Sequence, residues 1–258
     1  MNQKFSSFRS WLAPISLLIG LLAWQLISQW SGLPAFILPS PLAVWSRFLR
    51  ALKDGTLLLN TGVTLFEILL GLLAGVTLAT IIGYLVAKSR ALERVLSPYL
   101  VASQAVPLVA IAPLLVIWFG PGMFSKILIC ALIVFFPVLV NTIVGVRAVP
   151  PALYDLMRSL RASRGQILRK LEVPAALPVF LGGLRIGATL SVIGAVVGEF
   201  VGADRGLGFL INLGRGQYDT ALVFVAIFVL IFLALALYGL VAWMEGKLLS
   251  WQQTHSGI

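Results

Sequence analysis

Two glutamates interrupt otherwise apolar stretches of this sequence, and they are the residues in it best suited to chemistry. Glu67 stands in the middle of the stretch 57–87, and Glu199 lies near the end of the stretch 181–202. A carboxylate in an apolar environment is costly unless it is paired, so both are candidates for a function. Glu67 could line a passage, pair with a basic residue, carry protons, or hydrogen-bond at a helix interface. Glu199 could line a passage or form part of a gate.

Enzyme chemistry has little support in the sequence. The one histidine, His255, stands in the tail, and no histidine cluster or nucleophile–base pair lies in the apolar stretches. The one cysteine, Cys130, rules out an intrachain disulfide. No G-x-x-x-x-G-K-[ST] phosphate loop occurs. We therefore predict no catalytic site, no metal site and no cofactor bound by this chain.

Uncharged polar residues offer a second kind of chemistry. Gln104 and Asn141 lie in apolar stretches and could form hydrogen bonds with a solute in a passage. Residues of this type also join neighbouring helices within a membrane. Both interpretations of Gln104 and Asn141 stay open at this point.

The connection 147–180 carries a pattern suited to contact with a partner. After Pro150 and Pro151, which favour the start of a helix, apolar residues recur at helical spacing. They form one stripe, Leu153, Leu156, Met157 and Leu160, with arginines beside it. A second short helix is predicted at 166–171, after Gly165 and before Pro174. Such helices could rest on lipid headgroups or dock into a groove of a soluble partner.

The elements that must position these residues are membrane-spanning helices. The chain of 258 residues is 60% hydrophobic and 11% charged, whereas soluble proteins are about 25% charged. Six stretches are long enough, at about 20 apolar residues, to cross a bilayer. They are 11–30, 57–87, 97–119, 126–146, 181–202 and 221–244. We predict a single all-α integral membrane domain over 1–258, with proline kinks in its spans.

The basic residues indicate the orientation in the membrane. With the N-terminus inside, the inner segments hold 13 of the 19 Lys and Arg residues, and an even number of spans returns the C-terminus inside. The net charge of +10 is explained by this bias, so no nucleic acid partner is predicted. The first stretch is too long for a signal peptide core and is interpreted as an uncleaved span. The outer connection 31–56 is predicted to hold a short amphipathic surface helix.

Several segments together resemble the permeases of binding-protein-dependent ABC importers. The segment 155–178 is similar to their cytoplasmic loop, whose signature is Glu-Ala-Ala, three residues, Gly, about nine residues and Ile-x-Leu-Pro. Other stretches resemble the branch for nitrate, sulfonates, taurine, riboflavin and pyrimidine vitamin precursors. These are Ile37 to Pro41, Pro107 to Gly120, Phe135 to Pro137 with Asn141 and Thr142, and Gly198 with Glu199 to Gly208. The resemblance covers about residues 33–247.

The chain departs from this signature at four positions. Asp155 replaces the glutamate, Leu156 and Met157 replace the alanines, and Arg161 replaces the glycine. Glycine there would let the chain leave the helix through a positive φ. Arg161 must either accept that conformation, at about 1 kcal/mol, or the turn must move to Gly165. Residues that the resemblance assigns to ATPase coupling are Asp155, Leu156, Met157, Leu160, Arg161, Ala162 and Gly165.

The resemblance implies a type I importer permease in the bacterial inner membrane. A second permease chain, identical or different, would complete the pathway, and two cytoplasmic subunits would bind and hydrolyse ATP. An external solute-binding protein would deliver the substrate, with a slight preference for riboflavin or a pyrimidine precursor. Glu67, Gln104, Asn141 and Glu199 are the candidate pathway residues. The alternative is a secondary transporter driven by an ion gradient through Glu67.

Overall fold

The computed structural model describes residues 3–104 and 106–250, with side chains except those of residues 3–13, 101 and 104. Every regular element in this part of the chain is a helix. The first six are α1 (Gln3–Trp30), α2 (Pro41–Lys53), α3 (Thr56–Lys88), α4 (Arg90–Gln104), α5 (Leu108–Phe119) and α6 (Met123–Arg147). The others are α7 (Pro151–Ser159), α8 (Arg164–Ile167), the π-helix η1 (Leu168–Glu172), α9 (Val173–Gly202), α10 (Leu207–Gly216) and α11 (Thr220–Leu248).

The predicted membrane spans are helical, but one of them is divided into two helices. Among the described residues, four helical segments are long and apolar enough to cross a bilayer: Thr56–Lys88, Met123–Arg147, Arg164–Gly202 and Thr220–Leu248. The described side-chain portion of α1, Pro14–Trp30, and α5 are shorter apolar helices. The all-helical membrane architecture predicted from the sequence is confirmed.

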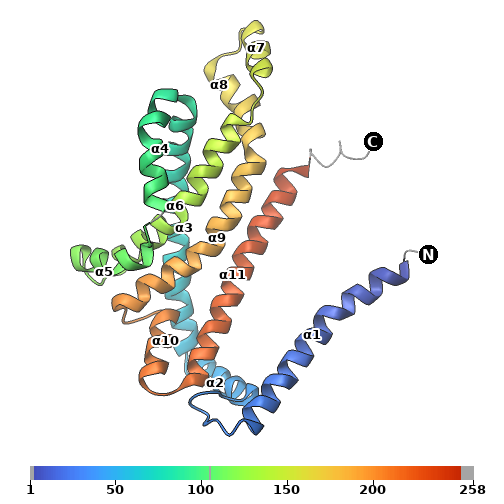
Figure 1. Cartoon of the computed structure of the whole chain (residues 1–258), viewed down its shortest axis with the longest axis vertical. Coiled ribbons are helices and arrows are strands. Elements are labelled where there is room, and N and C mark those ends of the chain that lie inside the picture. The colour runs from blue at the N-terminus through green and yellow to red at the C-terminus, as the bar shows by residue number, and fades with distance from the viewer. Residues whose placement is uncertain (1–2, 105, 251–258) are drawn as a thin grey trace.

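The predicted span 97–119 is not one helix. It divides between α4 and α5, which run in clearly different directions, and α5 projects sideways from the bundle (Figure 1). Pro107 stands between them with extended backbone. Proline lacks an N–H and its ring clashes with the preceding turn, which favours a break here. Pro113 and Pro137, by contrast, lie inside α5 and α6.

The centre of the bundle is α6, packed between α3 and α9. Glycines on both neighbours allow this close approach. A Cβ on Gly75 would lie 2.7 Å from the carbonyl oxygen of Ala131, and a Cβ on Gly194 would lie 2.7 Å from Cα of Cys130. Small residues let membrane helices bring their backbones together and gain packing contacts. Close backbone contact at these glycines therefore helps to define the three-helix core.

The two ends of the bundle differ. One end carries α7 and is here called the α7 end; the opposite end carries α2 and α10 and is called the α10 end (Figure 1). The predicted amphipathic helix in the connection 31–56 is α2, which Ser40 caps by accepting from the backbone N–H of Ala43. The helix α1 diverges from the bundle, and Trp24 attaches it through a hydrogen bond of 3.0 Å to the carbonyl of Pro39.

Candidate functional site

The helix α7 projects beyond the membrane helices at one end of the molecule (Figure 1). Pro150 precedes it and Pro151 is its first residue, as predicted. It packs to no great extent on any described helix. Its apolar stripe is uncovered: Leu156 is 55% exposed and Leu160 is 68% exposed. An apolar face with no neighbour in its own chain is a surface suited to a partner.

Hydrogen bonds at the end of α7 show at which residue the chain leaves the helix. The amide of Ala162 donates to the carbonyl of Met157 at 2.9 Å, and the amide of Arg161 donates to the carbonyl of Arg158 at 2.9 Å. This pair of bonds is a Schellman motif, which places the residue after the cap in the left-handed region. That residue is Arg161, with φ of 52°. The turn therefore stays at the position of the signature glycine and does not move to Gly165, which lies within α8.

The predicted second short helix, 166–171, is wrong as a separate element. The chain forms α8, continues through η1 and enters α9 without a break, so Pro174 lies inside helical structure. The start of α8 is fixed by a capping box, in which Ser163 and Gln166 bond each other's backbone amides. Pro174 is the second residue of α9, directly after the π-helical segment. The segment after α7 is thus continuous, through α8 and η1, with the membrane span α9.

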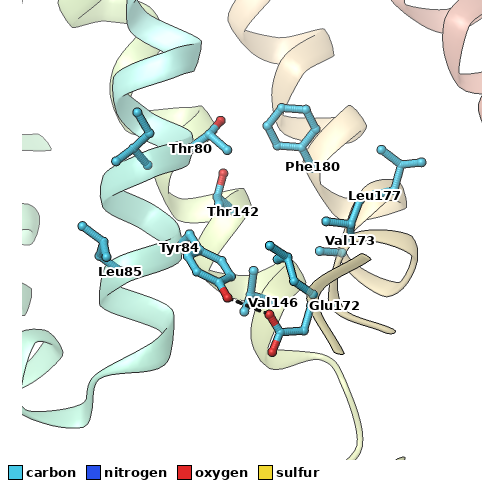
Figure 2. Close-up of a pocket in the computed structure, with 12 residues that line it drawn as sticks. Thr80, Tyr84, Leu85, Thr142, Val146, Glu172, Val173, Leu177 and Phe180 are labelled. Atoms are coloured by element: carbon cyan, nitrogen blue, oxygen red, sulfur yellow. Dashed lines mark hydrogen bonds between the residues drawn. The ribbon is translucent and has the colours of Figure 1, made fainter. Parts of the chain in front are cut away.

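A buried acidic residue in this junction escaped sequence prediction. Glu172 is 2% exposed and ends η1. The hydroxyl of Tyr84 donates to its Oε2 at 2.9 Å, and Lys88 forms an ion pair with its Oε1 (Figure 2 shows the Tyr84 bond). The only signal in the sequence was an acidic residue between the basic pair at 169–170 and the apolar run that follows.

A cavity of about 440 Å³ opens beside Glu172, between α3, α6 and α9. Its walls are apolar: Thr80 and Thr142 also line it, but their hydroxyls donate to the carbonyls of Val76 and Val138 in their own helices (Figure 2). The helices α3 and α9 are thus held apart at the α7 end, where Glu172 bridges them.

Two further ionisable contacts lie at the α7 end. Burial, together with the negative charge of Glu172, raises the pKa of Tyr154 to about 12, so its phenol stays protonated at neutral pH. Arg147 at the end of α6 forms an ion pair with Glu93 of α4. The hydrogen bond from Arg147 lowers the pKa of the Glu93 carboxyl, which stays ionised.

At the opposite end, Glu67 is fully buried and paired. Its Oε1 lies 2.8 Å from Nζ of Lys126, which is 5% exposed and belongs to α6. Its Oε2 is buried with no hydrogen-bond partner among the described residues. Of the alternatives left open by the sequence, this geometry matches pairing with a basic residue at a helix interface.

Glu199 belongs to the same polar cluster. Its Oε1 accepts from the hydroxyl of Thr64 at 2.6 Å, and Thr64 lies one helical turn from Glu67. Its Oε2 accepts from the backbone N–H of Gly208 near the start of α10. A carboxylate at the N-terminus of a helix is stabilised by unpaired amides and by the helix dipole. Glu199 therefore anchors α10 to the bundle.

The turn into α10 is built to admit this carboxylate. Gly206 has φ of 119°, and a Cβ on it would lie 2.2 Å from Oε1 of Glu199. Its amide donates to the side chain of Asn60 at 2.7 Å, which adds a second bond from α3 to the turn. Only glycine meets both the backbone conformation and the space at this position.

Asn141 lies apart from both clusters. Its side-chain amide donates to the carbonyl of Pro137, one turn earlier in α6, at 2.8 Å. It also lines a cavity of about 450 Å³ between the α4–α5 break, α6 and α9. The walls of this cavity are Ser103, Val106, Leu108, Ile133, Phe136, Pro137, Val140, Asn141 and Ile186, none of them charged. Gln104 ends α4, and its side chain lies outside the described residues.

The three candidate pathway residues whose side chains the structure describes therefore do not form one site. Glu67 and Glu199 share a buried cluster at the α10 end, whereas Asn141 lies on a cavity in the body of the bundle. The candidate coupling residues do come together, because all belong to α7, its Schellman turn and the start of α8.

Comparison with known proteins identifies the class. Residues 68–250 match the family described as "Binding-protein-dependent transport system inner membrane component". The fold agrees: the inward-facing MetNI methionine ABC transporter has TM-score 0.64 at 19% identity, covering 73% of this chain and 94% of that one. An amino acid ABC transporter crystallised with histidines has TM-score 0.61 at 20% identity, covering 78% and 98%. The chain is a multi-pass membrane permease subunit of an ATP-binding cassette importer.

Curated relatives show which branch of this permease family the chain resembles. The riboflavin transport system permease protein RibX of Chloroflexus aurantiacus is 47% identical, over 93% of this chain and 89% of its own length. The formylaminopyrimidine transport permease protein ThiX of Halalkalibacterium halodurans is 35% identical, over 89% and 91%. A putative aliphatic sulfonates permease, SsuC of Bacillus subtilis, is 34% identical, over 91% and 85%. This chain belongs to the binding-protein-dependent transport system inner membrane component family, as its motifs predicted.

Proposed function

We propose that this chain and a second permease chain form the pathway of an importer for a neutral, planar nitrogen heterocycle of the riboflavin type. The whole chain acts as one domain in the bacterial inner membrane, with the α7 end and both termini in the cytoplasm. Two ATPase subunits dock on α7 and hydrolyse ATP, and a solute-binding protein outside delivers the substrate. This chain binds no ATP and no other cofactor.

The observation that carries ATPase docking is the uncovered apolar stripe of α7. A Schellman turn and a capping box fix the helix at its end, while Leu156 and Leu160 stay exposed. A short helix with a fixed orientation and a bare apolar face suits a helix-in-groove contact with a soluble partner. The departures Leu156 and Met157 add apolar area to this stripe compared with alanine.

The substrate class rests on the cavity beside Asn141. Its volume of about 450 Å³ falls within the usual range of ligand pockets, roughly 300–1,000 Å³. Phe136 offers an aromatic face. Asn141 and Ser103 each donate to a backbone carbonyl of their own helix, and the amide oxygen and second N–H of Asn141 and the hydroxyl oxygen of Ser103 remain for ring carbonyls and N–H groups. Nitrate, sulfonates and taurine carry a negative charge or a sulfonate that Arg or Lys would recognise, and no such residue lines this cavity.

Docking is tested by purifying the tagged chain in mild detergent from its native cell. We expect an ATPase with a phosphate loop to accompany it in stoichiometric amount. Leu156→Asp with Met157→Asp should abolish that association and leave membrane insertion intact, because charge on the stripe opposes burial in a groove. Ser159→Asp, also exposed on α7, is the matched control. Unchanged association of the Leu156/Met157 variant would refute the docking assignment.

The substrate is tested by uptake in that cell. Removing this chain should lower ATP-dependent uptake of labelled riboflavin and leave taurine uptake unchanged. The reverse result would assign the chain to the sulfonate group. Uptake that persists without ATP under a proton gradient would instead support the secondary transporter, for which the buried Glu67–Lys126 pair offers no exposed carboxylate.

A further inference from the structure

Three segments that are far apart in the sequence meet at Glu172. From α3, Tyr84 donates to one carboxylate oxygen and Lys88 pairs with the other. From α7, the ring of Tyr154 lies 5.1 Å from Nζ of Lys88, a cation–π contact. Glu172 itself immediately precedes α9. Both of its oxygens are used, and its side chain is buried.

The chain gives α7 two covalent connections but none to α3. It is joined to α6 through residues 148–150 and to α9 through residues 160–172. Because α7 packs to no great extent on any described helix, its movement can reach α3 through α6, which packs closely on α3, or through side chains at the α7 end. Among the described residues, Lys88 of α3 contacts Glu172 and Tyr154, and Arg147 at the end of α6 donates to the carbonyl of Val86 at 3.2 Å.

Direct packing between α3 and α9 is interrupted at the α7 end. The cavity of about 440 Å³ separates α3 from α9 at this end, with Tyr84 and Leu85 on one wall and Val173 and Leu177 on the other (Figure 2). A space there allows the start of α9 to shift relative to the end of α3 unless a side chain bridges the two. The carboxylate of Glu172 bridges this space, and the π-helical segment that carries it is of a kind frequent at functional sites.

We propose that Glu172 is a positioning residue that locks the α7 end of α3 to the coupling segment. When the ATPase subunits move α7, α3 then follows together with α6 and α9, and the cavity keeps its shape. This inference rests on the proposed docking of an ATPase on α7. The pair persists through the cycle, since Lys88, Tyr84 and Glu172 belong to the part that moves as one body.

The test follows the movement of α3 directly and needs no transported substrate. In a Cys130→Ala background, Leu85→Cys reports on α3 and Leu177→Cys reports on α9. The assembled importer in proteoliposomes is trapped with ATP and vanadate, and the rate of thiol labelling is compared with the nucleotide-free state. We expect trapping to change both rates by about threefold or more in the otherwise unchanged complex.

Glu172→Ala should lower the response at Leu85→Cys by at least half, with α6 still packed on α3, and keep the response at Leu177→Cys, because α9 stays covalently joined to α7. Exchange of the pair, Lys88→Glu with Glu172→Lys, should restore at least half of the Leu85→Cys response. The matched control is Glu245→Ala, which breaks the ion pair of α11 with Arg185 of α9 and leaves α7 untouched. It should change neither response.

Each outcome separates the inference from the proposed function. If the unchanged complex retains no ATPase, the docking proposal fails, whatever Glu172 does. If the ATPase is retained and Leu85→Cys responds normally in Glu172→Ala, or if the exchange restores nothing, the locking role is refuted. If Glu172→Ala does not insert into the membrane, Tyr84→Phe and Lys88→Met test the locking role in its place. Each removes one contact with Glu172 and should lower the Leu85→Cys response by about half or more.

Discussion

Arg161 occupies a backbone position that favours glycine. Its φ of 52° lies in the left-handed region, which costs an L-residue roughly 1 kcal/mol. The Schellman bonds from Arg161 and Ala162 hold it there, since they satisfy the last carbonyls of α7. The local hydrogen bonds thus determine the position of the turn, and Arg161 adopts the unfavourable positive φ.

Arg161→Gly should therefore stabilise the end of α7 by about 1 kcal/mol, close to a fivefold change in local opening. Hydrogen exchange of the amides of Leu160, Arg161 and Ala162 in detergent measures it, and protection should rise. Arg158→Gly, inside the helix, is the control and should lower protection, because glycine lacks helix propensity. Lower protection in Arg161→Gly would contradict the strain argument.

The buried pair of Glu67 and Lys126 makes a second prediction at this scale. Lys126→Met leaves a carboxylate buried without its cation, which should destabilise the protein by about 3–5 kcal/mol. Glu67→Met added to it removes the orphaned charge and should recover most of that loss. Thermal unfolding in detergent gives the comparison.

A second substitution of Glu67 tests whether this residue has a structural role or a role in transport. Glu67→Gln should spare ATP-driven uptake in protein that is inserted and stable, since its oxygen faces Lys126 and no described cavity is lined by it. Complete loss of uptake in such protein would make Glu67 a pathway residue.

At the scale of elements, glycines decide which helices can touch. Gly75 faces the backbone of Ala131 on α6, whereas nothing lies within 4 Å of a Cβ on Gly239 of α11. Gly75→Ala should destabilise the protein by about 1–3 kcal/mol, because backbone atoms at 2.7 Å cannot yield as side chains do. Gly239→Ala should be neutral or stabilising by up to about 1 kcal/mol. Melting temperatures of the two variants in one detergent test this, and equal values would contradict it.

The elements show what periodicity can and cannot predict. Long apolar stretches identified α3, α6, α9 and α11 because backbone groups in lipid must be satisfied inside a helix. The α4–α5 break was expected only as a kink, since Pro107 indicates where regular bonding fails but not by how much direction changes. The η1 segment was missed because a π-helix depends on tertiary contacts and carries no periodic signal of its own.

The whole molecule brings together residues whose relation no local pattern contains. Glu172, Tyr84 and Tyr154 stand in three separate segments and meet only once α3, α7 and α9 are packed. The cluster of Glu67 with Glu199 was likewise visible in the sequence only as two isolated carboxylates. Their functions were left open there because partners such as Lys126 and Thr64 are set by helix packing. By contrast, the stripe on α7 could be predicted from one segment, since a helix alone determines it.

At the scale of the whole molecule, the proposed function requires that the α7 end face the cytoplasm. In a Cys130→Ala background, Asp204→Cys marks the α10 end and Arg164→Cys marks the α7 end; both positions are exposed. An impermeant thiol reagent is added outside intact cells, or to cells whose outer membrane has been permeabilised. It should label Asp204→Cys. It should label Arg164→Cys only after the inner membrane has also been opened. The basic residues of the α7 end favour the cytoplasm, since Lys and Arg are retained on that side. Labelling of Arg164→Cys from outside would place α7 away from any ATP, and an ATPase could then not dock there.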